Sequence, residues 1–303
     1  MAGPATEDRN PLFADLDLWP TDQAVAAMAR EQAAAAAAVE PEAEAIAAAA
    51  DAAAARLADG SGRLVHVGAG TSGRLAVQDG VELGPTYDWP ESRWAFALAG
   101  GAEALLTSVE GAEDDEGAGE AAMRGLGLGT ADVVIGVAAS GRTPFTVAAV
   151  RAAAAAGALT VGIAGNAGTP LLAAAAHPIL IETGAEVLAG STRMKAGTAQ
   201  KIALNLLSTA IMLRLGRIHA GLMVAMRATN RKLRIRATAM VGEIAGVGAA
   251  EAQAALERAA GDIRTAVLLA KGLDQAAAED ALRAADGNLR SALAALPSGS
   301  RSL

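Results

Sequence analysis

The chain of 303 residues contains no cysteine, and aromatic residues make up only 2% of it. Without cysteine, disulfides, thiolate nucleophiles and cysteine-ligated metal sites are excluded. Hydrophobic residues reach 52% of the sequence, and alanine supplies most of them. We therefore expect a protein in which helices dominate and pack closely through small side chains.

The sequence also lacks a basic stripe interleaved with aromatic residues, a leader segment and a membrane-spanning apolar run. The formal charge of −8 is spread over alternating residues rather than collected in a tail. Nucleic acid is therefore not expected as a partner. Residues 1–13 lack a charged region followed by an apolar core, and charged residues, glycine or proline interrupt the apolar runs. We expect a cytoplasmic protein that does not bind membranes.

Short apolar segments alternate with helical stretches between residues 63 and 215. Such alternation predicts an α/β fold with a doubly wound, parallel five-stranded sheet and helices on both faces. In such sheets ligands bind beyond the carboxyl ends of the strands. The expected strands are Leu64–Val67, Trp94–Leu98, Val133–Val137, Leu159–Ile163 and Ile179–Glu182.

Helical segments are expected on both sides of this sheet. Residues 1–58 are predicted to form an N-terminal arm and alanine-rich helices that pack on the core, which occupies residues 59–245. Residues 249–303 contain an internal repeat at an offset of 26 residues, in which Ala255–Val267 aligns with Ala281–Leu293. Each copy has the pattern of a helix, a glycine-containing turn and a second helix, which predicts a small helical tail.

The first expected strand leads into a glycine-rich turn, GAGTSG (68–73), and then into a helix. Backbone N–H groups at such a helix start bind phosphate, and Thr71, Ser72 and Gly73 lie at this position. The turn also matches the G-x-G-x-x-G pattern of dinucleotide sites. However, the next expected strand, Trp94–Leu98, ends without the acidic residue that would hold a ribose. The pattern favours a phosphate.

Two further polar clusters follow later strands. Ser140, Gly141 and Thr143 follow the third strand, directly before a proline suited to the first turn of a helix. The segment GSTRMK (190–195) opens a long helix predicted over 195–215. Clusters at the same edge of one sheet can converge on a single phosphate. The candidate phosphate-binding residues are Thr71, Ser72, Gly73, Ser140, Gly141, Thr143, Ser191, Thr192 and Lys195.

Taken together, these motifs resemble the N-acetylmuramic acid 6-phosphate etherases, which belong to the sugar-isomerase (SIS) domain superfamily. The resemblance covers about four fifths of the chain in register, and the tail resembles the small UBA-like helical domain of that family. The matching segments are TEDRNP (6–11), GAGTSGR (68–74), SVEGAEDD (108–115), AASGRTP (138–144), GSTRMKAGTAQK (190–201) and ATNRKLR (228–234).

The resemblance implies a SIS-type sheet and a carbon–oxygen lyase of peptidoglycan amino sugar recycling. Its substrate would be N-acetylmuramic acid 6-phosphate, and its products N-acetylglucosamine 6-phosphate and D-lactate. In the open-chain sugar the C2 hydrogen is acidic because it lies beside the C1 aldehyde. Elimination of lactate and addition of water then need two acid–base groups and no metal or other cofactor. The resemblance also implies a homodimer with sites near the interface.

Two glutamates match the catalytic positions of this family. The resemblance implies that Glu82 protonates the departing lactate and that Glu113 is the second acid–base group, the base at C2. Glu82 follows the phosphate loop by one short helix, and we expect one sugar to span both. For Glu113 the residues alone leave three rivals, Glu110, Asp114 and Glu116.

Two other functions remain compatible with the same sheet and loops. A phosphosugar aldose–ketose isomerase would move a proton between C2 and C1, and a sugar-phosphate-sensing regulator would bind without turnover. One departure from the family is Leu83-Gly84-Pro85, which replaces a common Cys-Pro-Pro run. The three histidines, which lie far apart in the sequence, are expected to be structural.

Overall fold

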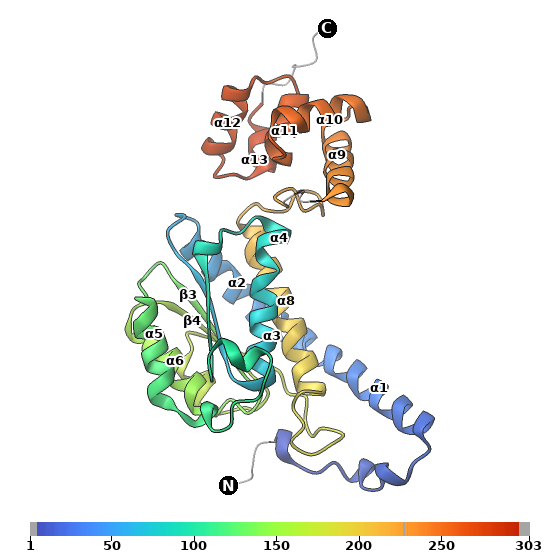
Figure 1. Cartoon of the computed structure of the whole chain (residues 1–303), viewed down its shortest axis with the longest axis vertical. Coiled ribbons are helices and arrows are strands. Elements are labelled where there is room, and N and C mark those ends of the chain that lie inside the picture. Colours follow the sequence, from blue (N-terminus) through green and yellow to red (C-terminus); the bar gives the residue numbers. More distant parts are fainter. Residues whose placement is uncertain (1–4, 227, 229, 297–303) are drawn as a thin grey trace. The chain divides into compact units, whose positions relative to one another are not determined.

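The computed structural model describes residues 5–226, 228 and 230–296. They form two compact units, shown with the rest of the chain in Figure 1. The first unit contains the described residues up to Val81 together with Ser92–Ala210, and the second contains Glu82–Glu91 and the described residues from Ile211 onward. Among the described helices, none combines the length and hydropathy needed to cross a membrane.

The first unit is built on a parallel five-stranded sheet in the order β2-β1-β3-β4-β5. This confirms the predicted α/β sheet. The fifth strand begins and ends two residues earlier than expected, at His177 and Leu180, because His177 and Pro178 pair with β4. Every residue of β1, β3 and β4 is buried, as expected for strands covered on both faces. The strands are β1 (Leu64–Gly68), β2 (Trp94–Leu98), β3 (Val133–Ala138), β4 (Leu159–Ala164) and β5 (His177–Leu180).

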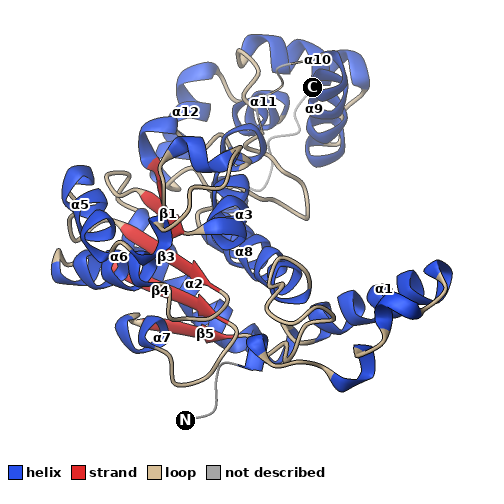
Figure 2. Ribbon diagram, turned by 60° about the horizontal axis from the view of Figure 1, so that its bottom comes forward, coloured by secondary structure: helices blue, strands red, loops and turns tan. Residues whose placement is uncertain are grey.

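Helices cover both faces of this sheet. Figure 2 shows α5, α6 and α7 on one face and α2, α3 and α8 on the other. The helix α1 lies N-terminal to α2 and exposes most of its surface. The helices are α1 (Thr21–Ala37), α2 (Ala43–Leu57), α3 (Gly70–Val81), α5 (Glu116–Leu126), α6 (Pro144–Ala155), α7 (Pro170–Ala174) and α8 (Lys195–Arg214).

The helix α2 shows how an alanine-rich sequence is recruited to the core. Its buried residues recur at intervals of three and four, which is the spacing of one helix face. Pro41 lies in the short 3₁₀ turn Glu40–Glu42 that separates α1 from α2. The small side chains let the helix approach the sheet closely. The buried residues are Ile46, Ala49, Ala50, Ala53, Ala54 and Leu57.

Two glycines allow α3 to start immediately after β1. A Cβ on Gly68 would lie 2.7 Å from the Cα of Gly73, and a Cβ on Gly73 would lie 2.3 Å from Cδ1 of Leu98. Neither position has room for a side chain. Gly73 is therefore a packing residue, and its N–H donates to the carbonyl of Ala69 at 3.0 Å.

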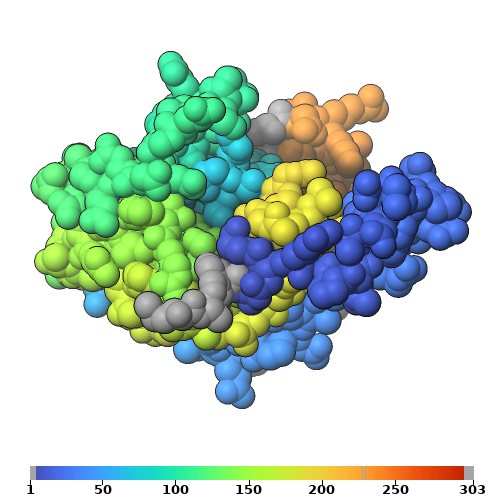
Figure 3. All heavy atoms as spheres, turned by 90° about the horizontal axis from the view of Figure 1, so that it is seen from below, coloured from blue at the N-terminus to red at the C-terminus, as the bar shows by residue number. Residues whose placement is uncertain are grey.

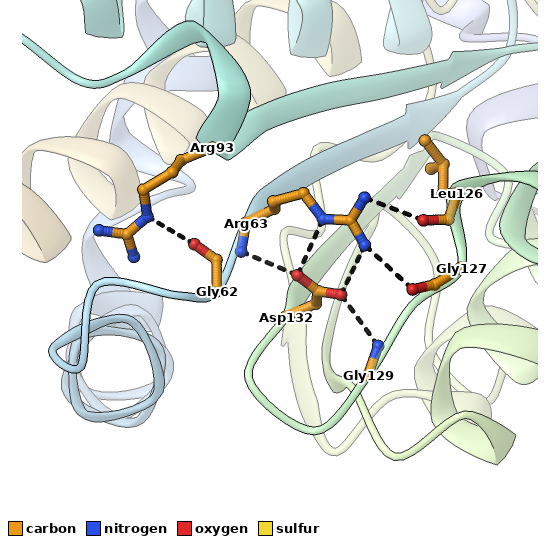
Figure 4. A network of polar contacts seen from close by, with 7 residues as sticks. All are labelled: Gly62, Arg63, Arg93, Leu126, Gly127, Gly129 and Asp132. Atoms are coloured by element: carbon orange, nitrogen blue, oxygen red, sulfur yellow. Dashed lines mark hydrogen bonds and ion pairs between the residues drawn. The ribbon is translucent and has the colours of Figure 1, made fainter.

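The amino ends of β1 and β3 are joined by an ion pair (Figure 4). The carboxylate of Asp132 accepts from Nη2 of Arg63 at 2.9 Å, from the backbone N–H of Arg63 at 2.8 Å and from that of Gly129 at 2.9 Å. Burial alone would raise the pKa of Asp132, but the hydrogen bonds from Arg63 and Gly129 outweigh it, so the pKa lies below its ordinary value. The ion pair of Arg63 and Asp132 therefore holds the amino ends of β1 and β3 together.

The order of the strands determines where a ligand can bind. The chain leaves β1 toward β2 on one side and continues from β3 toward β4 and β5 on the other. The adjacent strands β1 and β3 therefore form the switch point of this doubly wound sheet, where a crevice opens beyond their carboxyl ends. The turns after β1 and β3 are the two glycine-containing clusters singled out in the sequence.

The second unit is helical, and the internal repeat is visible in its backbone. In the first copy Ala260 and Gly261 have φ of +51° and +90°, and in the second Asp286 and Gly287 have φ of +50° and +76°. The next residue of each copy, Asp262 or Asn288, caps the following helix. Residues 297–303 of the predicted tail lie outside the described part. The helices are α4 (Leu83–Tyr87), α9 (Arg231–Ala245), α10 (Ala249–Arg258), α11 (Ile263–Ala270), α12 (Gln275–Ala284) and α13 (Leu289–Ala294).

Candidate active site

A cavity of about 450 Å³ lies beyond the carboxyl ends of β1 and β3. It is therefore at the switch point of the sheet, where the fold predicts a ligand. Its walls come from the turns after β1 and β3, the acidic loop before α5, the loop before α8 and the N-terminal arm. The lining residues are Glu7, Ala69, Gly70, Thr71, Ser72, Glu113, Asp114, Ala139, Ser140, Arg142, Thr143, Pro144, Gly190 and Thr192.

The turn after β3 has a fixed shape. The hydroxyl of Ser140 accepts from the backbone N–H of Arg142 at 3.1 Å. Gly141 has φ of +67°, and a Cβ there would lie 2.4 Å from the Thr169 hydroxyl oxygen, so only glycine fits. Thr143 directly precedes α6, the helix that Pro144 begins. The predicted residues Ser140 and Thr143 thus line the cavity, while Gly141 shapes the turn between them.

The turn after β1 supplies two hydroxyls, and one of them has a partner on α8. Thr71 and Ser72 both line the cavity. The buried hydroxyl of Ser72 donates to Oε1 of Gln200 at 2.9 Å. Nε2 of Gln200 is buried without a hydrogen-bond partner among the described residues. Sequence reasoning did not single out Gln200, although it lies in the matching segment GSTRMKAGTAQK (190–201).

The third cluster reaches the cavity only in part. Thr192 lines the cavity, and Ser191 and Lys195 are absent from its walls. At the start of α8 the buried carboxylate of Glu186 accepts from the backbone N–H of Lys195 at 2.9 Å. The chain's own carboxylate thus occupies the anion-binding end of this helix. The ammonium of Lys195 is 2.7 Å from the carboxylate of Glu31 on α1.

Of the acidic residues in the loop before α5, two line the cavity. Glu113 and Asp114 lie in the 3₁₀ turn η7 (Ala112–Asp114). Glu113 also lines an adjoining cavity of about 330 Å³, which includes Glu110. Asp115 instead caps α5, accepting from the N–H of Ala118 at 2.8 Å, and Glu116 is the first residue of that helix. The structure therefore brings Glu113 and its rival Asp114 into one cavity with the turns after β1 and β3.

Arg74 connects α3 with the segment that leads to these acids. Its Nε donates to the carbonyl of Ala104 at 2.8 Å, and its Nη2 donates to the carbonyl of Thr107 at 3.0 Å. Arg74 lies on α3, two residues after Ser72. A single side chain thus ties the start of α3 to the loop carrying Glu113.

The N-terminal arm forms part of the wall. Thr6 is fully buried; its hydroxyl accepts from Nδ2 of Asn166 at 3.2 Å, and its carbonyl accepts from the N–H of Gly190 at 3.3 Å. Figure 3 shows the arm, in dark blue, beside the loop before α8, in yellow. The next residue, Glu7, lines the cavity. Sequence reasoning placed Glu7 in the matching segment TEDRNP (6–11) but gave it no role in the site.

Glu82 lies at the other end of α3. The helix has twelve residues and ends at Val81, so Glu82 follows its last turn. Glu82 comes ten positions after Ser72, which corresponds to about 15 Å along a helix axis. Glu82 is exposed and is not among the residues that line the cavity. The expectation that one sugar spans both stays a prediction, and the twelve residues of α3 lie between the turn after β1 and Glu82.

The histidines that the structure places in the first unit hold structural positions. Nδ1 of the buried His66 accepts from Nε1 of Trp94 at 3.0 Å, and its Nε2 lies 3.7 Å from a carboxylate oxygen of Asp79. His177 begins β5. Across the described residues, no three His, Asp or Glu side chains gather closely enough to hold a metal ion.

Comparisons with known proteins found family models and relatives that match most of the chain. The family of glucokinase regulatory protein N-terminal SIS domains matches residues 45–154, and the SIS domain family matches residues 115–210. The chain is 50% identical to the N-acetylmuramic acid 6-phosphate etherase of Deinococcus radiodurans over 95% of this chain and 94% of the relative. It is 47% identical to that of Streptomyces avermitilis, over 96% and 94%. A phosphoheptose isomerase structure from Francisella tularensis is similar at 20% identity, with a TM-score of 0.45 over 63% of this chain and 96% of that chain.

Proposed function

The chain belongs to the N-acetylmuramic acid 6-phosphate etherase family, and we propose that its cavity beyond β1 and β3 is the site of the reaction. The protein is a carbon–oxygen lyase that cleaves the D-lactyl ether of N-acetylmuramic acid 6-phosphate. The products are N-acetylglucosamine 6-phosphate and D-lactate. The observation that carries the placement is that two hydroxyl-bearing phosphate loops and Glu113 line one cavity.

The phosphate is held by the two turns at the switch point. Thr71 and Ser72 begin α3, and Ser140 and Thr143 precede α6, so hydroxyls and backbone N–H groups face the same cavity. Two helices of twelve residues each direct the positive ends of their dipoles there. Such a cradle binds a dianion without a lysine. This is consistent with the pairing of Lys195 to Glu31.

The chemistry moves protons in two stages. In the open-chain sugar, the carboxylate of Glu113 removes the C2 proton, and the electron pair is first held as an enolate with the C1 aldehyde. It then forms the C2–C3 double bond as the C3–O bond breaks. An acid donates a proton to the oxygen of the departing lactate. Water then adds its oxygen to C3, and a proton returns to C2. Each step needs a carboxylic acid or a carboxylate, and none needs an electron acceptor.

We further propose that the enzyme is a cytoplasmic homodimer and that the acid is Glu82 of the partner copy. The length of α3 supports this arrangement, since Glu82 follows the end of the helix opposite the phosphate loop. A site assembled from two copies brings together residues that one helix keeps apart.

Exposed apolar side chains support an interface on this part of the chain. Val81, which directly precedes Glu82, is 54% exposed. Large apolar side chains scattered singly are ordinary, but several on neighbouring segments are typical of a surface that a partner covers. In the first unit they lie on the N-terminal arm, α1, the end of α3, the loops before α5 and α8, and α8 itself, at Leu12, Leu18, Val25, Val81, Leu106, Val109, Leu188 and Leu206.

The test is to incubate the purified protein with N-acetylmuramic acid 6-phosphate and to measure both products. We expect D-lactate and N-acetylglucosamine 6-phosphate in equal amounts, and loss of both in Glu113→Gln. Isomerisation of a sugar phosphate without release of lactate would contradict the lyase. Binding without any turnover would indicate a sensor instead. Wild-type turnover in Glu113→Gln would contradict the proposal that the reaction takes place in this cavity.

A further inference from the structure

Arg142 has a distinctive position in the cavity. Four charged residues of the described part of the chain line it, and three of them, Glu7, Glu113 and Asp114, are acidic. Among the described residues, Arg142 is the only one lining the cavity with a cationic side chain. The ammonium of Lys195, the cation expected from the sequence, is engaged with Glu31. An anionic substrate entering this cavity therefore meets one positive group.

The guanidinium of Arg142 is unused in the structure. It makes no hydrogen bond or ion pair with any described residue, and the side chain is exposed. The backbone beneath it is fixed, because its N–H donates to the Ser140 hydroxyl at 3.1 Å and Gly141 is packed against Thr169. An arginine held by its backbone with all side-chain donors available is suited to binding an anion.

We propose that Arg142 binds the carboxylate of the substrate's D-lactyl group and thereby selects sugar phosphates that carry it. This role rests on the proposed function, because it assigns a residue to one part of that substrate. The guanidinium presents two parallel N–H donors, which match the two oxygens of a carboxylate. Arg142 is thus a specificity-determining residue in the same cavity as the base Glu113.

The carboxylate is favoured over the phosphate as the partner of Arg142 for two reasons. The phosphate already has the hydroxyls of Thr71, Ser72, Ser140 and Thr143 and two helix starts. The lactyl carboxylate has no such cradle and must enter beside acidic side chains, which repel it. One guanidinium offsets that repulsion. A sugar phosphate without the lactyl group has no carboxylate for Arg142 to bind, so Arg142 adds nothing to its affinity.

The test compares two ligands that differ only in the lactyl group. Binding of N-acetylmuramic acid 6-phosphate and N-acetylglucosamine 6-phosphate is measured by calorimetry in a Glu113→Gln background, which prevents turnover. Arg142→Gln should lower the affinity for N-acetylmuramic acid 6-phosphate about tenfold or more, as expected for loss of one charge-assisted pair. It should lower the affinity for N-acetylglucosamine 6-phosphate less than about twofold. Arg142→Lys should restore only part of the loss, since an ammonium is not a planar fork.

Arg193 provides a matched control, because it is an exposed arginine of the loop before α8 that does not line the cavity. Arg193→Gln should leave both affinities unchanged. If Arg142→Gln lowers both affinities equally, Arg142 binds the phosphate and the proposal is wrong. The proposal is also wrong if neither affinity falls. The binding comparison does not need turnover. Failure of the wild type to release D-lactate would therefore contradict the etherase function separately.

Discussion

Ser72 on α3 donates its hydroxyl hydrogen to Oε1 of Gln200 on α8, at 2.9 Å, and both side chains are buried. A serine hydroxyl has one hydrogen, so Ser72 cannot donate to Gln200 and to a phosphate at the same time. Nε2 of Gln200 has no partner among the described residues. A half-turn of this amide would direct Nε2 to Ser72 and release the hydroxyl hydrogen to the ligand.

The first prediction follows from this pair. Gln200→Glu keeps an acceptor beside Ser72, removes the N–H donor and adds negative charge near the phosphate. We expect KM for N-acetylmuramic acid 6-phosphate to rise about tenfold or more, with a smaller change in kcat. Gln253→Glu, on α10, is a control without a role in the cavity. An unchanged KM in a folded Gln200→Glu protein would show that Gln200 does not orient Ser72.

A second prediction concerns the turn after β3. Ser140→Ala removes a cavity hydroxyl and the acceptor for the N–H of Arg142. Because the phosphate is bound in both the ground state and the transition state, KM should rise about tenfold while kcat stays within about threefold. Steady-state kinetics of lactate release measures both. A fall in kcat at saturation with an unchanged KM would remove Ser140 from phosphate binding. Ser61→Ala, at an exposed position before β1, should have no effect.

A third prediction concerns stability and pH at the opposite end of the sheet. The hydrogen bonds to Asp132 lower its pKa below the ordinary 3.8 despite burial. The ionised carboxylate is thus favoured in the folded state, and its contribution is present above about pH 4 and lost as the pH falls through the lower folded-state pKa. Asp132→Asn should lower the free energy of unfolding by about 2 kcal/mol at pH 7.

Urea titrations at pH 7 and pH 3 test this prediction. The difference between Asp132→Asn and wild type should shrink at the lower pH. Glu120→Gln, which removes the exposed pair of Glu120 with Arg124 on α5, should change the free energy by less than about 0.5 kcal/mol. If the difference in the free energy of unfolding is equally large at both pH values, the contribution of Asp132 does not depend on its charge.

A fourth prediction separates the two glutamates. In heavy water, an enzyme that keeps the C2 base exchanges the C2 hydrogen of the substrate even when the acid is missing. Glu82→Gln should therefore still incorporate deuterium at C2 without releasing lactate, whereas Glu113→Gln should do neither. Proton NMR of the sugar measures the exchange. Exchange in Glu113→Gln but not in Glu82→Gln would reverse the two roles.

The sheet could be predicted from the sequence because its signals are local. Apolar segments such as Val133–Val137 alternate with helical stretches, and glycines mark the turns that follow β1 and β3. Since the carboxyl ends of parallel strands meet at one edge, the convergence of Ser72 and Ser140 also follows from the pattern. The repeat in residues 255–293 predicted matching turns for the same reason.

The rest of the site depends on contacts between residues far apart in the chain. Gln200 meets Ser72 across 128 positions, and Lys195 meets Glu31 across 164. No local pattern indicates that a lysine beside two hydroxyls is neutralised by a distant carboxylate. The contribution of Glu7 likewise depends on the burial of Thr6 against the loops after β4 and before α8.

The most direct test of the central claim is the lactate-release activity of mixed dimers. Glu82→Gln and Glu113→Gln, carrying different tags, are co-expressed and allowed to pair. If the cavity of one copy works with the partner's Glu82, one of the two sites in each mixed dimer is intact, and randomly paired protein should recover about a quarter of the wild-type activity. If both glutamates act within one chain, neither site is intact. Activity no greater than that of each variant alone would contradict the shared site.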